Sequence, residues 1–230
     1  MKNFFTQIRN IWNHEELRKK LGITLGLILV YRIGSFIVIP GVNSDVLAEQ
    51  MASSGSGGLG DLLSLFTGGA FSRASIFALG IMPYISASII VQLLGIAVPA
   101  VQKMQAEGES GRKKINQYTR FLTIAITLVQ APGYLATSVV AVPGAVANPS
   151  TFWWFSAMVI LVSSTLVIMW LGERITDKGV GNGISLLIMI GIIATFPQAI
   201  IQEFIHPDTG LFFFLVEMAF LLVVIGCSVA

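Results

Sequence analysis

Charged residues are scarce in this sequence, and their scarcity excludes most soluble proteins. Only 11% of the 230 residues are Asp, Glu, Lys or Arg, whereas soluble domains carry about 25%. So few charges cannot cover a water-exposed surface, and a soluble globular enzyme is therefore excluded. The formal net charge is only +2 and no basic block dominates, which argues against a nucleic-acid-binding protein.

Cysteine is nearly absent as well, since Cys227 is the only one. A single thiol forms no intrachain disulfide, and it cannot support a zinc or iron–sulfur site built on thiolates. The sequence also lacks a P-loop, a nucleophile elbow and a histidine–carboxylate pair within an apolar run, the motifs that carry much enzyme chemistry. We therefore expect no catalytic residue, no metal and no cofactor.

Long uncharged runs are what the sequence has instead, because 54% of its residues are hydrophobic. About 20 apolar residues in a helix cross the hydrocarbon core, whereas transmembrane barrels show short alternating segments. The sequence predicts an all-α polytopic membrane protein with six spans. We expect these spans at roughly 21–40, 75–98, 121–142, 152–172, 184–202 and 211–230.

The basic residues predict the orientation of these spans. Twelve of the 14 Lys and Arg residues precede the first span or fall between spans two and three or four and five. Cytoplasmic connections are the ones enriched in Lys and Arg, so the N-terminus is expected in the cytoplasm. Residues 1–20 predict an interfacial amphipathic helix rather than a signal peptide, because apolar residues recur there at helical spacing.

The external segment 41–73 is long for a connection between spans. Its Ser/Gly-rich middle is followed by residues 59–70, which are apolar but too short to cross a membrane. One interpretation is a half-helix resting on the bilayer. The other is a short helix folded back into the protein, which implies a cavity because irregular backbone at depth needs protein or water around it. The residues alone do not decide between them.

Four runs carry a family resemblance: residues 32–42 (RIGSFIVIPGV), 67–90 (TGGAFSRASIFALGIMPYISASII), 108–120 (GESGRKKINQYTR) and 169–185 (MWLGERITDKGVGNGIS). In this order they closely resemble the bacterial SecY family, the channel subunits of the general protein translocase. The resemblance implies a SecY-type helical bundle with ten spans in two inverted halves. The chain would supply a cytoplasmic N-terminus (1–20), the first half of the channel (21–202), and an external loop with the start of the sixth span (203–230). It also ends within an apolar run, so we expect the N-terminal part of a longer protein.

The resemblance implies a channel that passes unfolded secretory polypeptides and releases transmembrane segments laterally into lipid. An aliphatic ring suits that task because it deforms around any sequence and dewets when empty. The resemblance places part of this ring on Ile81, Ile85 and Ile188. Ile81 and Ile85 are four residues apart and would share a helix face. Without the resemblance, all three would be interpreted as bundle core or lipid contacts.

The same resemblance assigns residues 55–72 to a plug helix that seals the external funnel at rest. Its proposed members are Leu59, Asp61, Leu62, Leu63, Leu65 and Phe66. The flanking glycines fit either a hinge, because glycine accepts large dihedral changes, or simple loop flexibility. We expect Asp61 to face the aqueous funnel rather than lipid.

The second and third spans would form one side of a lateral gate. Pro83 is expected to kink the second span, because proline removes a backbone hydrogen bond. Four polar residues are assigned to the gate on these spans: Ser86, Ser88, Gln92 and Gln130. They represent either ordinary interhelical hydrogen bonding or a polar seam that tunes opening.

Residues 103–120 are expected to form a basic cytoplasmic loop that anchors the topology. The resemblance adds Arg112, Lys113 and Lys114 as contacts for the motor ATPase SecA or the ribosome, which must supply energy. Further implied partners are SecE, SecG, signal sequences, nascent polypeptides and the lipid bilayer of the bacterial inner membrane, without a specific nucleic-acid site.

Three charges near apolar segments stay open to interpretation: Arg32, Arg73 and Glu217. A charge within a membrane is costly and marks a functional site by default, although pairing or snorkelling would also explain it. Two rival classes, a secondary transporter and a membrane-embedded enzyme, need several polar or charged groups at mid-membrane. These spans have almost none.

Overall fold

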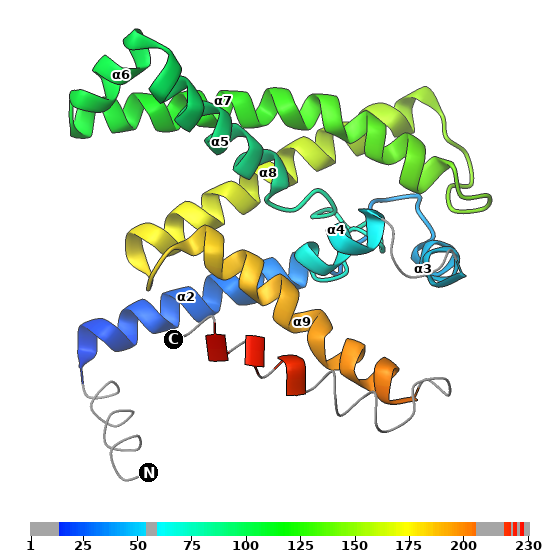
Figure 1. Cartoon of the computed structure of the whole chain (residues 1–230). Coiled ribbons are helices and arrows are strands. Elements are labelled where there is room, and N and C mark those ends of the chain that lie inside the picture. Colours follow the sequence, from blue (N-terminus) through cyan, green and yellow to red (C-terminus); the bar gives the residue numbers. More distant parts are fainter. Residues whose placement is uncertain (1–13, 54–58, 206–218, 222, 225, 228–230) are drawn as a thin grey trace.

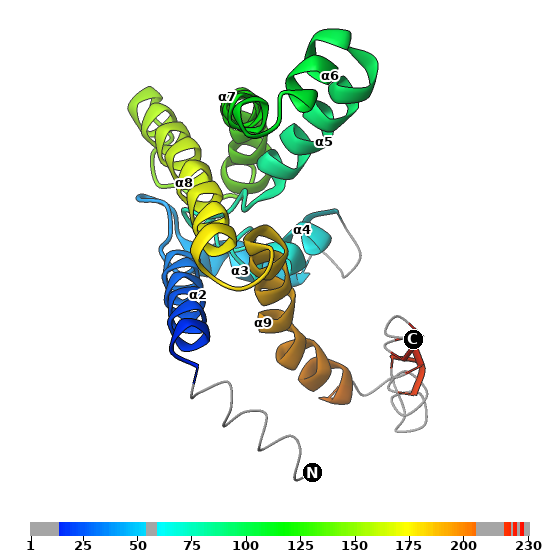
Figure 2. The ribbon, with the colours of Figure 1, turned by 90° about the vertical axis from the view of Figure 1, so that its left-hand side faces the viewer.

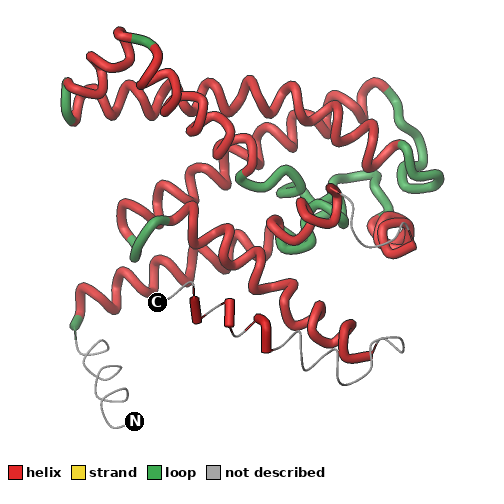
Figure 3. Tube along the Cα trace, viewed as in Figure 1, coloured by secondary structure: helices red, strands yellow, loops and turns green. Residues whose placement is uncertain are grey.

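The computed structural model describes residues 14–53, 59–205, 219–221, 223–224 and 226–227. The elements of this part are α2 (Glu15–Gly34), α3 (Ser44–Ser53), α4 (Leu59–Thr67), α5 (Met82–Ala97), α6 (Pro99–Ala106), α7 (Glu109–Tyr134), the π-helical turn η1 (Leu135–Val140), α8 (Thr151–Lys178) and α9 (Gly183–Ile205) (Figure 1). Figure 3 shows only helices and connecting loops in the described ranges, so the predicted all-α class is confirmed.

Helix α8 is the central helix of the bundle. It packs against α7, α9 and α2, while α5 packs along α7 and α4 packs against α9. In both views α4 lies between α5 and α9 (Figures 1 and 2). Buried residues recur along α8 at a spacing of three or four, as a helix with neighbours along much of its surface requires; they include Leu161, Ile168, Leu171 and Ile175.

Two helical stretches in the described ranges are long and apolar enough to cross a membrane, Glu109–Val140 and Thr151–Lys178. They cover the predicted third and fourth spans. A third stretch qualifies if Met82–Ala97 and Pro99–Ala106, which meet at a bend of 100°, count as one span. The predicted amphipathic N-terminus up to residue 13 and most of the sixth span lie outside the described residues.

The second predicted span begins later than expected, because residues 68–81 form a chain of turns and α5 starts at Met82. Ser75 pairs with Val38 in an isolated antiparallel bridge, and the Ile39 N–H donates to the Ala74 carbonyl at 2.9 Å. Ala74 and Ser75 are fully buried, so this irregular backbone is surrounded by protein, the condition under which it is tolerated at depth. Composition alone cannot distinguish such an apolar turn segment from a helix.

The expected kink at Pro83 is wrong. Pro83 lies in the first turn of α5, where the backbone N–H would have no helical partner, so proline fits without breaking a bond. The prolines that do lie inside helices are Pro132 of α7 and Pro197 of α9. A π-helical turn begins at Leu135, three residues after Pro132, and such turns commonly accommodate a disturbed helical ladder.

The expected basic loop at 103–120 is also wrong, because this segment is largely helical. It comprises the end of α6, a turn at Gly108 (φ 72°) and the first half of α7. Lys113 and Glu109 form an ion pair at 3.3 Å with helical i, i+4 spacing. Charge indicated exposure to water correctly, but exposure does not prevent a helix from continuing beyond the apolar region.

Buried apolar residues form two clusters. The Trp153 cluster contains Ile39, Leu47, Phe71, Ala74, Ala78, Ala131, Tyr134, Leu135, Val139, Ala145, Trp153, Ala157 and Leu161. The Ile81 cluster contains Tyr31, Phe77, Ile81, Ile168, Leu171, Ile175 and Leu187. The first gathers around the turn segment, α7 and the start of α8, and the second joins α2, α8 and α9 to the start of α5.

Candidate functional site

The three residues predicted for the aliphatic ring meet at the Ile81 cluster. Ile81 is 8% exposed and caps the start of α5. Its carbonyl accepts the Ile85 N–H at 3.1 Å, so the two residues stand one helical turn apart. Ile85 of α5 and Ile188 of α9 are half-buried and pack against the same cluster. The fold therefore brings together residues more than 100 positions apart in the sequence.

Helix α9 also carries an exposed isoleucine, Ile192, that the sequence analysis did not single out. A shallow depression of about 380 Å³ on α9 is lined by Ser185, Ile188, Met189, Ile192 and Ile193. Ile192 follows Ile188 by one helical turn and is 42% exposed. The spacing repeats that of Ile81 and Ile85, and this repeat was the available signal.

Helix α4 is docked onto the bundle through one side. Leu63 packs against the Trp153 cluster and Thr67 is buried, whereas Leu62, Leu65 and Phe66 are exposed. The side chains of Leu59 and Asp61, and residues 55–58, lie outside what the structure describes. Contacts with both α9 and the Trp153 cluster favour the folded-back interpretation over a helix resting on the bilayer.

Hydroxyl groups tie α4 to the turn segment that follows it. The Ser64 and Ser72 side chains share a hydrogen bond, and the Phe71 N–H donates to Thr67 Oγ1 at 3.1 Å. The Tyr134 hydroxyl of α7 in turn donates to the Phe71 carbonyl at 2.9 Å. The chain of contacts therefore runs from α4 through the turns to α7.

Helices α5 and α7 pack against each other, and the buried residues of both are mostly small or hydroxyl-bearing. The buried face of α5 consists of Pro83, Ala87, Val91 and Gly95, and that of α7 includes Gly111, Thr119, Thr123, Thr127 and Ala131. The threonine hydroxyls on α7 donate to carbonyls four residues earlier, for example Thr127 to Thr123 at 2.7 Å. Small residues allow helix backbones to approach within a membrane.

The predicted gate residues are not joined across the two helices. The Gln92 amide donates to the Ser88 hydroxyl at 3.2 Å within α5 itself. Ser86 is half-buried on α5, and Gln130 is exposed on α7. These polar groups are therefore not what holds α5 to α7.

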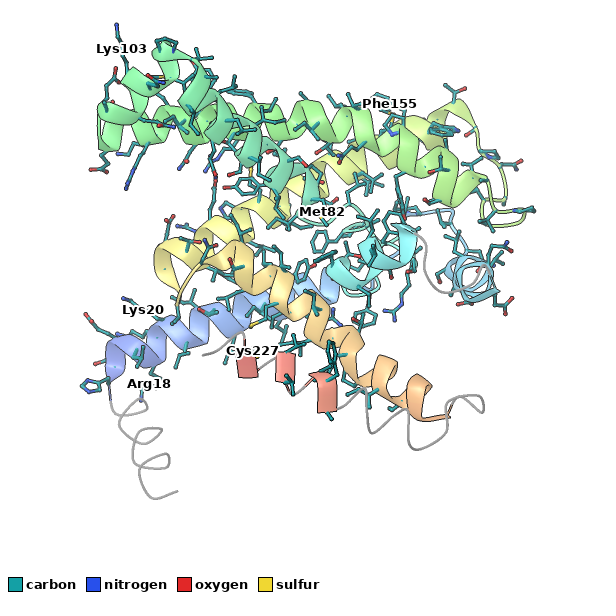
Figure 4. All side chains as sticks on the ribbon, viewed as in Figure 1. Arg18, Lys20, Met82, Lys103, Phe155 and Cys227 are labelled. Carbon is teal, nitrogen blue, oxygen red and sulfur yellow. The ribbon has the colours of Figure 1, made fainter. Side chains whose placement is uncertain are left out.

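The basic residues in the first turns of α7 are exposed at the end of the molecule where α6 meets α7. Lys114 pairs with Glu107 at 3.1 Å, and Lys113 pairs with Glu109; Arg112 is also exposed. Figure 4 shows Lys103 at this end of the molecule, far from Met82 in the middle of the bundle. The groups are thus available to a partner but distant from the Ile81 cluster.

Arg32 and Arg73 both face the Phe36 ring, with their guanidinium carbons 5.5 and 4.9 Å from its centroid. Such contacts are weakly attractive cation–π interactions. Glu217, the third charge that the sequence left open, lies outside the described residues. Across the described ranges, no group of three or more His, Cys, Asp or Glu residues could hold a metal ion.

Sequence comparison connects this arrangement to known proteins. The SecY family model matches residues 75–230. The protein translocase subunit SecY of Escherichia coli K12 is 48% identical over 204 residues, covering 87% of this chain and 46% of the relative. The subunit of the same name from Haemophilus influenzae is 45% identical over 195 residues, covering 85% and 44%. The chain therefore spans about half the length of the curated relatives it matches.

Solved structures show the same fold at low sequence identity. A protein-conducting channel has a TM-score of 0.52 at 19% identity, covering 88% of this chain and 41% of that one. Sec61 in the canine ribosome–channel complex from the endoplasmic reticulum has a TM-score of 0.53 at 20% identity, with the same coverage. Since the family model matches well over half of the sequence, the chain belongs to the SecY family.

Proposed function

We propose that this chain forms the first half of the central subunit of a protein-conducting channel. The channel passes unfolded secretory polypeptides across the bacterial inner membrane and releases transmembrane segments into lipid. The chain has no catalytic role, so the energy comes from an external motor or the ribosome. Support comes from the family, from relatives named protein translocase subunits, and from the channel fold.

One observation carries this proposal: Ile81, Ile85 and Ile188 converge from α5 and α9 on one apolar cluster. Aliphatic side chains offer no hydrogen bonds to a passing chain and dewet a narrow constriction. Partial exposure of Ile85 and Ile188 leaves them able to contact a cargo. Ile192 extends this surface by one turn of α9.

The remaining sites follow the same proposal. Helix α4 is the plug, within a segment that extends over 55–72. The lateral gate runs along α5 and α7, which pack against each other. Its proposed members are Pro83, Ser86, Ser88, Gln92 and Gln130. Lipid then meets the exposed apolar residues of these two helices.

The proposed organisation places residues 1–20 in the cytoplasm, the half-channel at 21–202, and an external loop with the start of the sixth span at 203–230. SecE and SecG are the proposed accessory subunits. SecA and the ribosome are the proposed cytoplasmic partners, and the exposed residues Arg112, Lys113 and Lys114 are the contacts proposed for them.

A crosslinking experiment tests the ring. Residues 1–230, with Cys227 replaced by serine, are joined to the remainder of the E. coli relative to give a complete chimaeric channel. Single cysteines replace Ile81, Ile85 or Ile188, and a polypeptide is stalled during translocation. We expect each cysteine to crosslink to the stalled polypeptide, because the ring surrounds it.

Cysteines at Ile96 of α5 and Ile201 of α9 are the matched controls, since these residues are 76% and 57% exposed on the same helices. They should crosslink weakly because they face lipid. Equal crosslinking at ring and control positions would contradict the ring assignment.

A further inference from the structure

The C-terminal end of α4 lies directly on the backbone of α9. A Cβ atom added to Gly191 would clash with the Phe66 carbonyl oxygen, and one added to Gly68 would lie 3.2 Å from the Gly191 Cα atom. Contacts this short leave no space for a side chain between the two backbones. Gly191 is therefore required by this close approach, although it lies in the middle of a helix, where glycine is otherwise unfavourable.

A cation from a third helix lies at the same end of α4. The Arg32 Nη1 atom of α2 is buried without a hydrogen-bond partner in the described part of the protein. It lies so close to Gly68 that an added Cβ would be 2.6 Å away. The last carbonyls of a helix carry a partial negative charge, so this guanidinium stabilises α4 where it now lies.

The chain turns sharply just after the point where α4 meets α9. Gly68 and Gly69 have φ angles of 66° and 82°, which glycine adopts without steric cost. The Gly69 N–H closes the end of α4 by donating to the Ser64 carbonyl at 2.8 Å. These glycines let the chain turn away immediately after the contact with α9.

We propose that Gly191 and Arg32 form a seat that holds α4 in its resting position. Gly191 lets the backbone of α4 reach α9, and Arg32 holds the carbonyl end of α4 by charge–dipole attraction. At Gly191 the contact joins the two backbones directly, so no α9 side chain stands in the path of α4 at this point. The seat rests on the proposed function of α4 as a plug, and it identifies the residues that set the plug's resting position.

The experiment uses the complete chimaeric channel in lipid vesicles, with Cys227 replaced by serine. Spin labels on Leu65→Cys of α4 and Ile193→Cys of α9 report the distance between the two helices by pulsed electron paramagnetic resonance. The backgrounds are the parent, Gly191→Ala, Gly191→Val, Arg32→Gln and Arg32→Lys. Gly133→Ala is the matched control, because a Cβ at Gly133 of α7 meets nothing within 4 Å.

We expect a single short distance in the parent and in Gly133→Ala. Gly191→Val should populate a longer distance, Gly191→Ala the same distance to a smaller extent, and Arg32→Gln should broaden the distribution. Arg32→Lys should restore the parent distribution, because it keeps a positive charge at the helix end. Unchanged distances in both Gly191→Val and Arg32→Gln would overturn the seat. If Gly191→Val does not fold, Gly191→Ala and the Arg32 pair decide.

Ion leak through the resting channel separates the seat from the plug function. We expect about tenfold more leak in Gly191→Val, as overpacking at a close contact commonly produces an effect of this size. Arg32→Gln should increase the leak about threefold, in line with a helix-end charge. A longer α4–α9 distance with unchanged leak would support the seat and contradict the plug function.

Discussion

The two buried clusters differ in how they are held together. The Trp153 cluster is bordered by directional bonds between distant segments: Trp153 Nε1 donates to the Pro40 carbonyl at 2.9 Å, and Tyr134 donates to the Phe71 carbonyl. The Ile81 cluster is mainly aliphatic, and its outer members Ile85 and Ile188 are only half-buried. Directional bonds define one arrangement, whereas aliphatic contacts tolerate several. The first region is therefore suited to support, and the second to the adaptable channel wall that we propose.

Of the substitutions that test this difference between the clusters, removal of Trp153 should lower the stability of the protein most. Trp153→Ala empties a large buried volume and leaves the Pro40 carbonyl without its donor, so we expect the free energy of unfolding to fall by about 3–5 kcal/mol. Thermal unfolding of the purified chimaeric channel in detergent measures the loss. Trp170→Ala is the control, because Trp170 is 50% exposed, belongs to neither buried cluster and has its ring beside Arg174 in a cation–π contact. Equal losses in the two variants would contradict the supporting role of the Trp153 cluster.

Two isoleucines of the Ile81 cluster, one fully buried and one half-buried, should differ in their effects on stability and on ion leak. Ile168→Ala, at a position 1% exposed, should cost about 2–5 kcal/mol of stability, and Ile188→Ala about half as much because Ile188 is half-buried. Resting ion leak should show the opposite order, because only Ile188 belongs to the proposed ring. Stability is measured by thermal unfolding, and leak by ion flux from vesicles. A larger leak in Ile168→Ala would remove the distinction between core and ring.

Tyr134→Phe should have the smallest effect. It keeps the ring packed on Phe71, with centroids 4.8 Å apart, but removes one of the two donors to the Phe71 carbonyl, which still accepts the Ala74 N–H at 3.3 Å. The loss of one such hydrogen bond costs about 0.5–1.5 kcal/mol. Tyr118→Phe, at an exposed position, should change stability by less than about 0.5 kcal/mol. Indistinguishable unfolding midpoints would show that this bond adds no stability.

Much of the fold was predictable because the membrane constrains sequence strongly. Uncharged runs indicated the apolar helices, and the four motif runs indicated the family. The ring residues Ile81, Ile85 and Ile188 came from that resemblance, and the structure brings them to one cluster. Ile192 was missed although its spacing from Ile188 repeats that of Ile81 and Ile85, because such repeats are common wherever most positions of a helix are apolar.

Three predictions from the sequence were wrong for the same reason. Apolarity and charge indicate the environment of a segment rather than its backbone conformation. Residues 68–81 are buried but turn, because pairing with the segment after α2 replaces helical bonds. Residues 103–120 are exposed but largely helical. Pro83 falls in the first turn of α5 rather than its interior, and only the position of the helix start decides whether a proline kinks.

Composition and motifs were enough to predict the membrane environment, the helical class and the family, because scarce charge, long apolar runs and four specific motifs are local properties. Which helix ends meet could be learned only from the folded chain. The contact of α4 with Gly191, the position of Arg32 beside Gly68, and the bond from Tyr134 to Phe71 all join segments far apart in the chain. Such contacts depend on the path of the backbone, which composition and spacing along one helix do not specify.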